Sequence, residues 1–355
     1  MAHALRIAAR GLGRTWPNPA VGCVIVKAGV IVGRGWTQPG GRPHAEVMAL
    51  AQAGANAQGA TAYVTLEPCA HHGKTGPCAL ALVAAGVARV VSALQDPDPR
   101  VSGQGHAILR GAGVEVIENV MHAEAIRANA GFLKRVRAGL PFVTLKLATT
   151  LDGRIATASG ESRWITGASA RRATHAMRLN HDAVMIGSGT ARADDPDLTV
   201  RDLGAGHQPL RIVMDTHLSH NPDSRLGRSA KTHPIWLIHG PDAPAQARDA
   251  WAGQGAILLE SACENNHLDP RAALQRLAAQ GLTRIFCEGG GTLAASLIRA
   301  KLVDDLALFT AGALIGADGQ ASLAALNLAA LKDAPRLTLR ETKIFGPDAY
   351  SLWSV

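Results

Sequence analysis

Four residues in the first quarter of the chain have the types and the order that a catalytic zinc site requires. They are His44, Glu46, Cys69 and Cys78. One imidazole and two thiols supply three protein ligands, and a catalytic zinc ion keeps its fourth position for water. The metal lowers the pKa of that water, so that an adjacent carboxylate can take its proton. We therefore interpret His44, Cys69 and Cys78 as zinc ligands and Glu46 as the proton shuttle of a hydrolytic reaction.

The order of these residues follows the signature of zinc-dependent nucleobase deaminases, with one departure. That signature closes with P-C-x-x-C, whereas eight residues separate Cys69 from Cys78 in this chain. The longer loop should place His71 and Lys74 beside the substrate pocket. A closed structural site, with His71 or His72 as a fourth ligand, is the alternative that the residue types leave open.

Length and composition narrow the class of protein. The 355 residues are enough for about two domains, and 47% apolar against 18% charged residues argues against disorder. Only 4% are aromatic, too few for a single-strand stacking surface, and the net charge of +8 favours an anionic partner. Five scattered cysteines suggest a reducing compartment. With neither a signal peptide nor a membrane-length apolar run, we expect a cytoplasmic protein.

The elements that must position the zinc residues fit a three-layer α/β/α unit. Apolar runs at 21–26 and 30–35 flank a short turn and predict a hairpin, and a helix over 44–53 begins with His44 and Glu46. A polar helical stretch ends near Pro141, which gives a deaminase domain at 1–140 and a second domain at 141–355. The other elements expected in the first domain are strands at 62–66, 88–93 and 114–117 and helices at 4–11, 78–85 and 104–112.

The second domain shows another α/β pattern. Helical stretches are expected at 168–180, 271–280 and 291–300. Strands are expected at the apolar runs 142–148, 183–187, 210–214, 234–239, 256–259, 285–287 and 305–310.

Three features of the second domain could bind a ligand. Glu288 leads into three glycines, 289–291, and then a helix, which suits a phosphate, although an ordinary turn is the alternative. The segment 187–190 follows another apolar strand, and ligands often bind at such strand ends. Arg178 and Arg201 could hold a phosphate bidentately, although a solvated surface is the commoner place for an arginine.

The longer motifs resemble one family, the bifunctional riboflavin-biosynthesis deaminase/reductases, over nearly the whole chain. The first domain carries T-x-P-N-P-x-V-G at 15–22, H-A-E at 44–46 and E-P-C-x-H-x-G-x-T-x-P-C at 67–78. The second carries L-K-L-A-x-T-L-D-G-R-I-A at 145–156, S-x-W-I-T at 162–166, I-G-x-G-T at 186–190, D-x-P-x-L-x-V-R at 194–201 and E-G-G-x-x-L at 288–293. The long spacing between the cysteines is characteristic of this branch. Trp16 is a mild departure, because a small residue is expected there.

The resemblance implies two folds and two sequential reactions. A cytidine-deaminase-like α/β/α domain, with one zinc ion per chain, would deaminate 2,5-diamino-6-ribosylamino-4(3H)-pyrimidinone 5′-phosphate. A dihydrofolate-reductase-like α/β domain would then use NADPH to reduce 5-amino-6-(5-phosphoribosylamino)uracil to the ribitylamino product. A homo-oligomer, either a dimer or a tetramer, is plausible for this family.

The resemblance also assigns residues. In the deaminase, Asn18, His71 and Lys74 would contact the substrate. In the reductase, the substrate and its phosphate would be bound by Ser162, Arg178, Leu198, Arg201 and Glu288. NADPH would be bound by Ala148, Trp164, Thr190, Asp194, Gly290, Gly291, Thr292, Leu293, Ala294, Ala295 and Ser296. Asp152 is a proton-donor candidate only through its place in the L-D-G-R motif.

Three rival interpretations make different demands on the sequence. A tRNA adenosine deaminase would need P-C-x-x-C and a concentrated basic stripe, and neither is present. A zinc-stabilised scaffold would not need Glu46. An enzyme with a degenerate reductase half would have lost the motifs at 145–201 and 288–296. We therefore expect a small phosphorylated pyrimidine as the partner, and neither nucleic acid nor a membrane.

Overall fold

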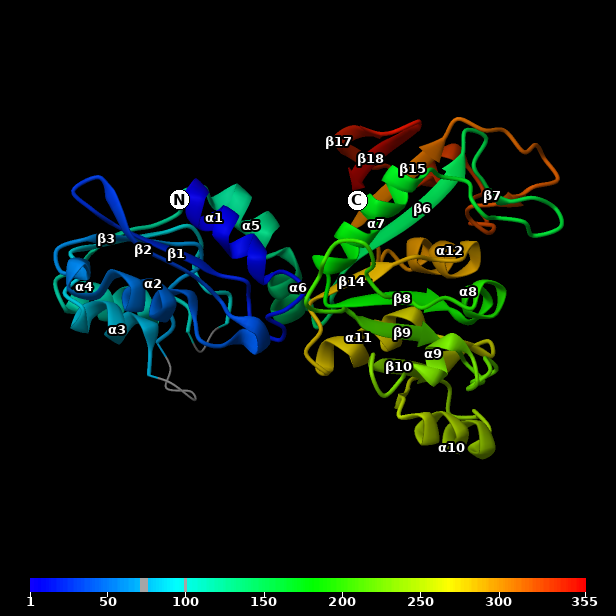
Figure 1. Ribbon diagram of the computed structural model, residues 1–355, viewed down its shortest axis with the longest axis horizontal. Helices are drawn as coiled ribbons and strands as arrows, with labels where there is room; N and C mark the ends of the chain where they lie inside the picture. Colours follow the sequence, from blue (N-terminus) through cyan, green and yellow to red (C-terminus); the bar gives the residue numbers. More distant parts are fainter. Residues whose placement is uncertain (71–75, 99–100) are drawn as a thin grey trace. The chain divides into compact units, whose positions relative to one another are not determined.

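The predicted hairpin forms one side of a five-stranded sheet in the computed structural model, which describes residues 1–70, 76–98 and 101–355 (Figure 1). The chain divides into two compact units, Met1–Leu140 and Pro141–Val355. His71, His72 and Lys74 lie outside the described residues. The strand order in the first unit is β2-β1-β3-β4-β5, with β1 antiparallel to both neighbours and the others parallel. The strands are β1 (Gly22–Lys27), β2 (Val30–Trp36), β3 (Thr61–Val64), β4 (Arg89–Ser92) and β5 (Glu115–Ile117).

Strand glycines let helices pack directly on this sheet. A Cβ on Gly22 would lie 2.0 Å from the Ala4 carbonyl oxygen, and one on Gly35 would lie 2.0 Å from that of Ala45. The helix α1 (Ala2–Ala8) therefore covers one face and α2 (Ala45–Ala53) the other, which gives the three layers (Figure 1). The other helices are α3 (Cys78–Ala84), α4 (Gln104–Gly111), α5 (His122–Ala128) and α6 (Ala130–Ala138).

The second unit is built on a nine-stranded sheet of order β11-β10-β9-β8-β14-β6-β15-β18-β17. Its seven strands from β11 to β15 are parallel, and their buried apolar runs are typical of a sheet covered on both faces. The strands are β6 (Phe142–Thr150), β8 (Ala183–Gly187), β9 (Leu210–Met214), β10 (Ile235–His239), β11 (Ile257–Glu260), β14 (Arg284–Cys287), β15 (Asp305–Ala311), β17 (Thr338–Phe345) and β18 (Asp348–Ser354).

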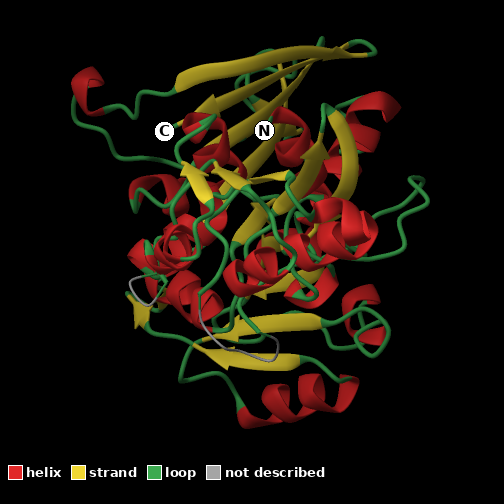
Figure 2. Cartoon of the chain, turned by 90° about the vertical axis from the view of Figure 1, so that its left-hand side faces the viewer, coloured by secondary structure: helices red, strands yellow, loops and turns green. Residues whose placement is uncertain are grey.

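Six helices and two small ladders complete the second unit as the structure describes it (Figure 2). The ladders pair β7 (Arg154–Ala156) with β16 (Gln320–Ala321), and β12 (Cys263–Glu264) with β13 (His267–Leu268). The helices are α7 (Ala168–Leu179), α8 (Ser188–Asp194), α9 (Arg225–Arg228), α10 (Ala245–Gln254), α11 (Pro270–Ala279) and α12 (Gly291–Arg299).

The C-terminal hairpin was absent from the sequence expectations. Strands β17 and β18 extend the sheet beyond β15 in antiparallel pairing. Most side chains of β17 are exposed, so the strand lacks the apolar pattern of the parallel strands. None of the described helices has the length and apolarity needed to cross a membrane.

Candidate metal centre and reductase site

The three expected zinc ligands converge in the first unit. The Nδ1 atom of His44 lies 3.6 Å from the sulfur of Cys69 and 3.3 Å from that of Cys78, and the three ligand atoms all lie within 4.8 Å of one another. Tetrahedral zinc with ordinary bond lengths separates a nitrogen and a sulfur ligand by about 3.6 Å. One imidazole, two thiols and this spacing fit a zinc ion.

Two helix starts position these ligands. His44 is the N-cap residue of α2, and Cys78 is the first residue of α3. The Cys78 backbone N–H donates to the Cys69 sulfur at 3.3 Å, and the Ala79 N–H donates to the Cys69 carbonyl at 3.2 Å. The loop that carries Cys69 is therefore fastened to the first turn of α3.

A buried carboxylate fastens the other side of that loop. Glu67 is 3% exposed. Its Oε2 accepts the N–H groups of Asp96 at 3.1 Å and Gly103 at 2.9 Å. Its Oε1 accepts those of Gly105 at 2.9 Å and His106 at 3.3 Å. The carboxylate thus satisfies free donors at the start of α4, where a negative charge is favourable.

Close backbone packing completes this support. A Cβ on Gly105 would lie 1.9 Å from the Pro68 carbonyl oxygen, so α4 can approach the Glu67–Cys69 segment only because residue 105 is glycine. Glu67 is part of the E-P-C motif, but no pattern in the sequence indicates its bonds to residues 29–39 positions further on.

Glu46 has the environment of a group that both accepts and donates a proton. It is 3% exposed, in the first turn of α2. Burial, with the nearby Cys69 thiolate, raises the pKa of Glu46 to about 7. Proton transfer is most effective when the pKa lies near the working pH.

The two cysteines differ in protonation: Cys78 keeps its proton and Cys69 is ionised. The Cys78 thiol donates to the Cys69 sulfur, and this bond, together with the one from His44, lowers the pKa of Cys69 to about 4. The same bond raises the pKa of Cys78. Cys69 is therefore a thiolate at neutral pH, the form in which cysteine binds metals.

Asn18 is held in a fixed orientation. Its side-chain amide donates to the Gly41 carbonyl at 3.0 Å. Gly41 has a φ of 84°, and a Cβ there would lie 2.3 Å from the Asn18 amide nitrogen. No hydrogen bond from the described residues reaches the side-chain oxygen of Asn18, which could accept one from a ligand.

In the second unit, Arg178 and Glu288 form a nearly buried pair. The guanidinium donates to the carboxylate at 2.5 Å and 3.0 Å, and to the Thr199 carbonyl at 2.6 Å. The two side chains are 11% and 12% exposed. Burial alone would raise the pKa of Glu288, but Arg178 and Lys146 bring it below its usual value.

Lys146 is a member of this cluster that the sequence analysis missed. It belongs to β6, next to β14, whose last residue precedes Glu288. Burial lowers the pKa of Lys146, and Glu288 partly offsets that effect. In the sequence it stands inside an apolar strand, in the L-K-L motif, and that motif was the one signal that could have identified it.

Arg201 lies at the edge of the cluster. Its guanidinium is 52% exposed and lies 3.3 Å from Asp197. Its backbone N–H donates to His175 Nδ1 at 3.3 Å. Burial, followed by Arg178 and then Arg201, lowers the pKa of His175, so both arginines act on the same imidazole.

The three glycines form the turn before α12. Gly289 and Gly290 have φ of 80° and 49°. Thr190 donates to the Gly289 carbonyl at 3.3 Å, and a Cβ on Gly290 would lie 2.8 Å from its hydroxyl oxygen. The expected NADPH residues of the 187–190 and 290–293 segments therefore lie together. Ala294 and Ala295 are fully buried in α12, and Ser296 is half-buried.

The remaining assigned residues occupy separate places in the second unit. Ala148 lies on β6, Asp194 ends α8, and Ser162 lies in the loop before α7. Trp164, in the same loop, is 66% exposed with the Arg171 guanidinium 4.5 Å from its ring centre. Leu198 has a φ of 57° and a buried side chain in the core around β8 and β9.

Asp152 does not suit the role of proton donor. Thr150 donates to its carboxylate at 2.5 Å, and the Gly316 N–H at 2.7 Å. These bonds lower the pKa of Asp152 to about 2. The group is therefore a carboxylate at neutral pH, which holds a loop and has no proton to give.

Comparison with known proteins agrees with the two-site arrangement. Residues 1–94 match the model of the cytidine and deoxycytidylate deaminase zinc-binding region, and residues 141–350 match that of the RibD C-terminal domain. The Escherichia coli K12 riboflavin biosynthesis protein RibD is 44% identical over 360 residues, with 98% of this chain and 96% of that protein covered. The chain belongs to the RibD family. It is thus a bifunctional deaminase/reductase of riboflavin biosynthesis, with a zinc-binding deaminase part and a reductase part.

Solved RibD structures share this architecture. Acinetobacter baumannii RibD, form 2, is 38% identical, with a TM-score of 0.89 over 99% of this chain and 97% of that one. A Thermotoga maritima protein is 31% identical, with a TM-score of 0.87 over 100% of this chain and 97% of that one. That protein is named a diaminohydroxyphosphoribosylaminopyrimidine deaminase/5-amino-6-(5-phosphoribosylamino)uracil reductase. The RibD fold thus confirms the expected cytidine-deaminase-like and dihydrofolate-reductase-like halves.

Proposed function

We propose that residues 1–140 deaminate 2,5-diamino-6-ribosylamino-4(3H)-pyrimidinone 5′-phosphate, with zinc held by His44, Cys69 and Cys78. We further propose that residues 141–355 reduce 5-amino-6-(5-phosphoribosylamino)uracil with NADPH. The observation that carries the first assignment is the convergence of three zinc-type ligands beside the buried Glu46. The Thermotoga maritima relative, whose name states both reactions, supports the substrates.

In the deamination, Glu46 is the residue that moves the proton. Zinc, when bound, supplies Lewis-acid activation of a water molecule. With a pKa of about 7, the Glu46 carboxylate can take a proton from the attacking water and give it to the departing amine. Asn18 presents its carbonyl oxygen to a polar edge of the base. His71 and Lys74 are proposed to contact the same substrate.

In the reduction, the chain binds and orients both reactants. NADPH supplies the hydride, and the proposed cofactor residues are Ala148, Trp164, Thr190, Asp194 and the segment 290–296. Arg178 and Arg201 provide positive charge for the substrate phosphate. Glu288 fixes the Arg178 guanidinium through two hydrogen bonds. Ser162 and Leu198 are the other proposed substrate contacts.

The substitution Glu46→Gln tests the deaminase assignment. We expect the variant to retain one zinc ion per chain and to lose ammonia release by at least a hundredfold, because it keeps all three ligands but has no group to move the proton. Reduction of pre-deaminated substrate should be unchanged. Loss of zinc, or full ammonia release, would remove Glu46 from the proposed role.

The family relationship also supports a cytoplasmic homo-oligomer, a dimer or a tetramer, acting on a small phosphorylated pyrimidine. Light scattering of the purified chain would measure its mass in solution. A monomer of 36.9 kDa at micromolar concentration would contradict the oligomer.

A further inference from the structure

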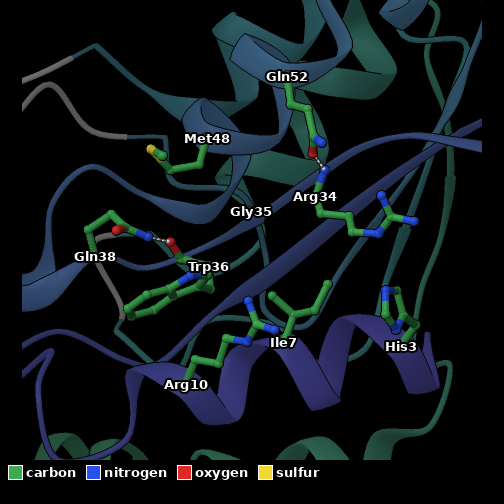
Figure 3. Close-up of a pocket in the computed structure, with 9 residues that line it drawn as sticks. All are labelled: His3, Ile7, Arg10, Arg34, Gly35, Trp36, Gln38, Met48 and Gln52. Atoms are coloured by element: carbon green, nitrogen blue, oxygen red, sulfur yellow. Dashed lines mark hydrogen bonds between the residues drawn. The ribbon is translucent and has the colours of Figure 1, made fainter. Parts of the chain in front are cut away.

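A pocket in the first unit shares no residue with the proposed zinc and substrate sites. Its volume is about 450 Å³, within the range of small-molecule sites. Figure 3 shows its walls: α1 and the short 3₁₀ turn Ala9–Gly11 on one side, β2 behind, and α2 on the other side. The pocket therefore lies at the free edge of the sheet, between the two helices that cover its opposite faces.

Two arginines and a histidine line the pocket, and its lining residues include no carboxylate. His3 and Arg10 come from the α1 side and Arg34 from β2 (Figure 3). His3 and Ile7 lie one turn apart on the same face of α1, and Arg10 follows in the 3₁₀ turn. Within the described residues, neither Arg10 nor Arg34 forms a salt bridge. A concave surface with uncompensated positive charge attracts anions, and arginine binds phosphate through several donors.

An indole and two side-chain amides supply further polar and aromatic groups, beside Ile7, Gly35 and Met48. Trp36 is half-buried, with the Arg14 guanidinium 5.6 Å from its ring centre. Gln38 donates to the Trp36 carbonyl at 2.8 Å, and Gln52 accepts the Arg34 backbone N–H at 2.7 Å. These bonds fix both amides and leave the Gln38 carbonyl and the Gln52 amino group to meet a ligand.

The same two bonds occupy part of the edge that a peptide strand would use. An edge strand can add another strand only through unpaired backbone groups. On β2, the Arg34 N–H and the Trp36 carbonyl are already paired with side chains. An added strand would have to displace both side chains, whereas a small molecule would not.

We propose that this pocket binds a phosphate monoester whose molecule also contains a planar ring, as a nucleoside monophosphate does. Arg10 and Arg34 contact the phosphate, and Trp36 with the two amides contacts the ring. This pocket is separate from the proposed binding sites of the deaminase and reductase substrates.

Calorimetry on the zinc-loaded full chain, with saturating NADP⁺ to fill the reductase cofactor site, tests this proposal. The probe is adenosine 5′-monophosphate, with adenosine and inorganic phosphate as its two halves. The pocket variant is Arg10→Gln with Arg34→Gln. The matched control is Arg6→Gln with Arg127→Gln, because both residues are exposed, lie outside the pocket and carry the same total charge.

We expect the nucleotide to bind the parent and the control equally, and the pocket variant at least tenfold more weakly. Adenosine should not bind, and phosphate should bind more weakly than the nucleotide. Equal nucleotide affinity in all three proteins, or no binding to the parent, would overturn the proposal. If inorganic phosphate binds as tightly as the nucleotide, the proposed contact between the pocket and a planar ring is wrong.

Discussion

Glu67 should support the zinc site although it is not a ligand. In Glu67→Gln the side chain keeps its shape but retains one acceptor oxygen in place of two. Two of the four backbone N–H groups then face an amide NH₂. A hydrogen bond to a charged group is worth about 1.5–3 kcal/mol, so losing two should lower the free energy of unfolding of the first unit by about 3–6 kcal/mol.

The same change should weaken zinc binding. Cys69 follows Glu67 by two residues, and α4 packs against the segment between them. Loss of such support for a metal ligand commonly reduces metal affinity about 10–100-fold. Competition with a chromophoric chelator measures the affinity, and denaturant titration measures the stability.

Glu115→Gln is the matched control for this prediction. Glu115 lies on β5 and pairs with Arg89 at the surface, where the two side chains are 54% and 46% exposed. A surface pair of this kind is worth less than about 1 kcal/mol, so zinc affinity should not change. If Glu67→Gln retains both the stability and the zinc affinity of the parent, the positioning argument is refuted.

Two further predictions concern the second unit. His181 donates from Nδ1 to the Met177 carbonyl and accepts the Thr144 hydroxyl at Nε2, and burial, with Arg284, lowers its pKa to about 3. In the unfolded chain this histidine has a pKa near 6.5, so between pH 6.5 and 3 the unfolded state binds more protons than the folded state. The free energy of unfolding therefore falls as the pH falls, by about 3 kcal/mol at pH 4. Denaturant titrations at pH 7 and pH 4 should show this loss in the parent protein but not in His181→Gln. An equal loss of stability in both proteins would refute the role of His181. Arg201→Ala should raise the reductase KM about tenfold by removing a charged phosphate contact and leave ammonia release unchanged, whereas an unchanged KM would exclude Arg201 from the phosphate site.

The sequence analysis picked out His44, Cys69 and Cys78, which the structure brings together, because the signature of a zinc site has few residue types in a fixed order. His44 and Glu46 are two residues apart at a helix start, and zinc ligands are restricted to a few residue types. The hairpin, the parallel strands and most of the helices were also predicted, since their apolar patterns are strong.

The positions that the sequence missed depend on contacts between distant segments. Glu67 accepts hydrogen bonds from backbone groups of a loop and a helix, and side-chain patterns in the sequence do not indicate such bonds. Lys146 is a single polar residue in an apolar strand, which alone does not predict a role. The exposed strand β17 has no apolar pattern. For Asp152 the motif suggested a proton donor. In the structure its carboxylate instead accepts hydrogen bonds from Thr150, Ile315 and Gly316 and holds a loop in place.

The most direct test of the account follows ammonia release and NADPH absorbance together in one sample. Zinc-loaded protein is mixed with 2,5-diamino-6-ribosylamino-4(3H)-pyrimidinone 5′-phosphate and NADPH. We expect ammonia to appear first and NADPH loss to follow it with a lag, and Glu46→Gln to abolish both unless pre-deaminated substrate is added. NADPH consumption without ammonia, or no reaction in zinc-loaded protein, would contradict the assignment of the two sequential reactions to this chain.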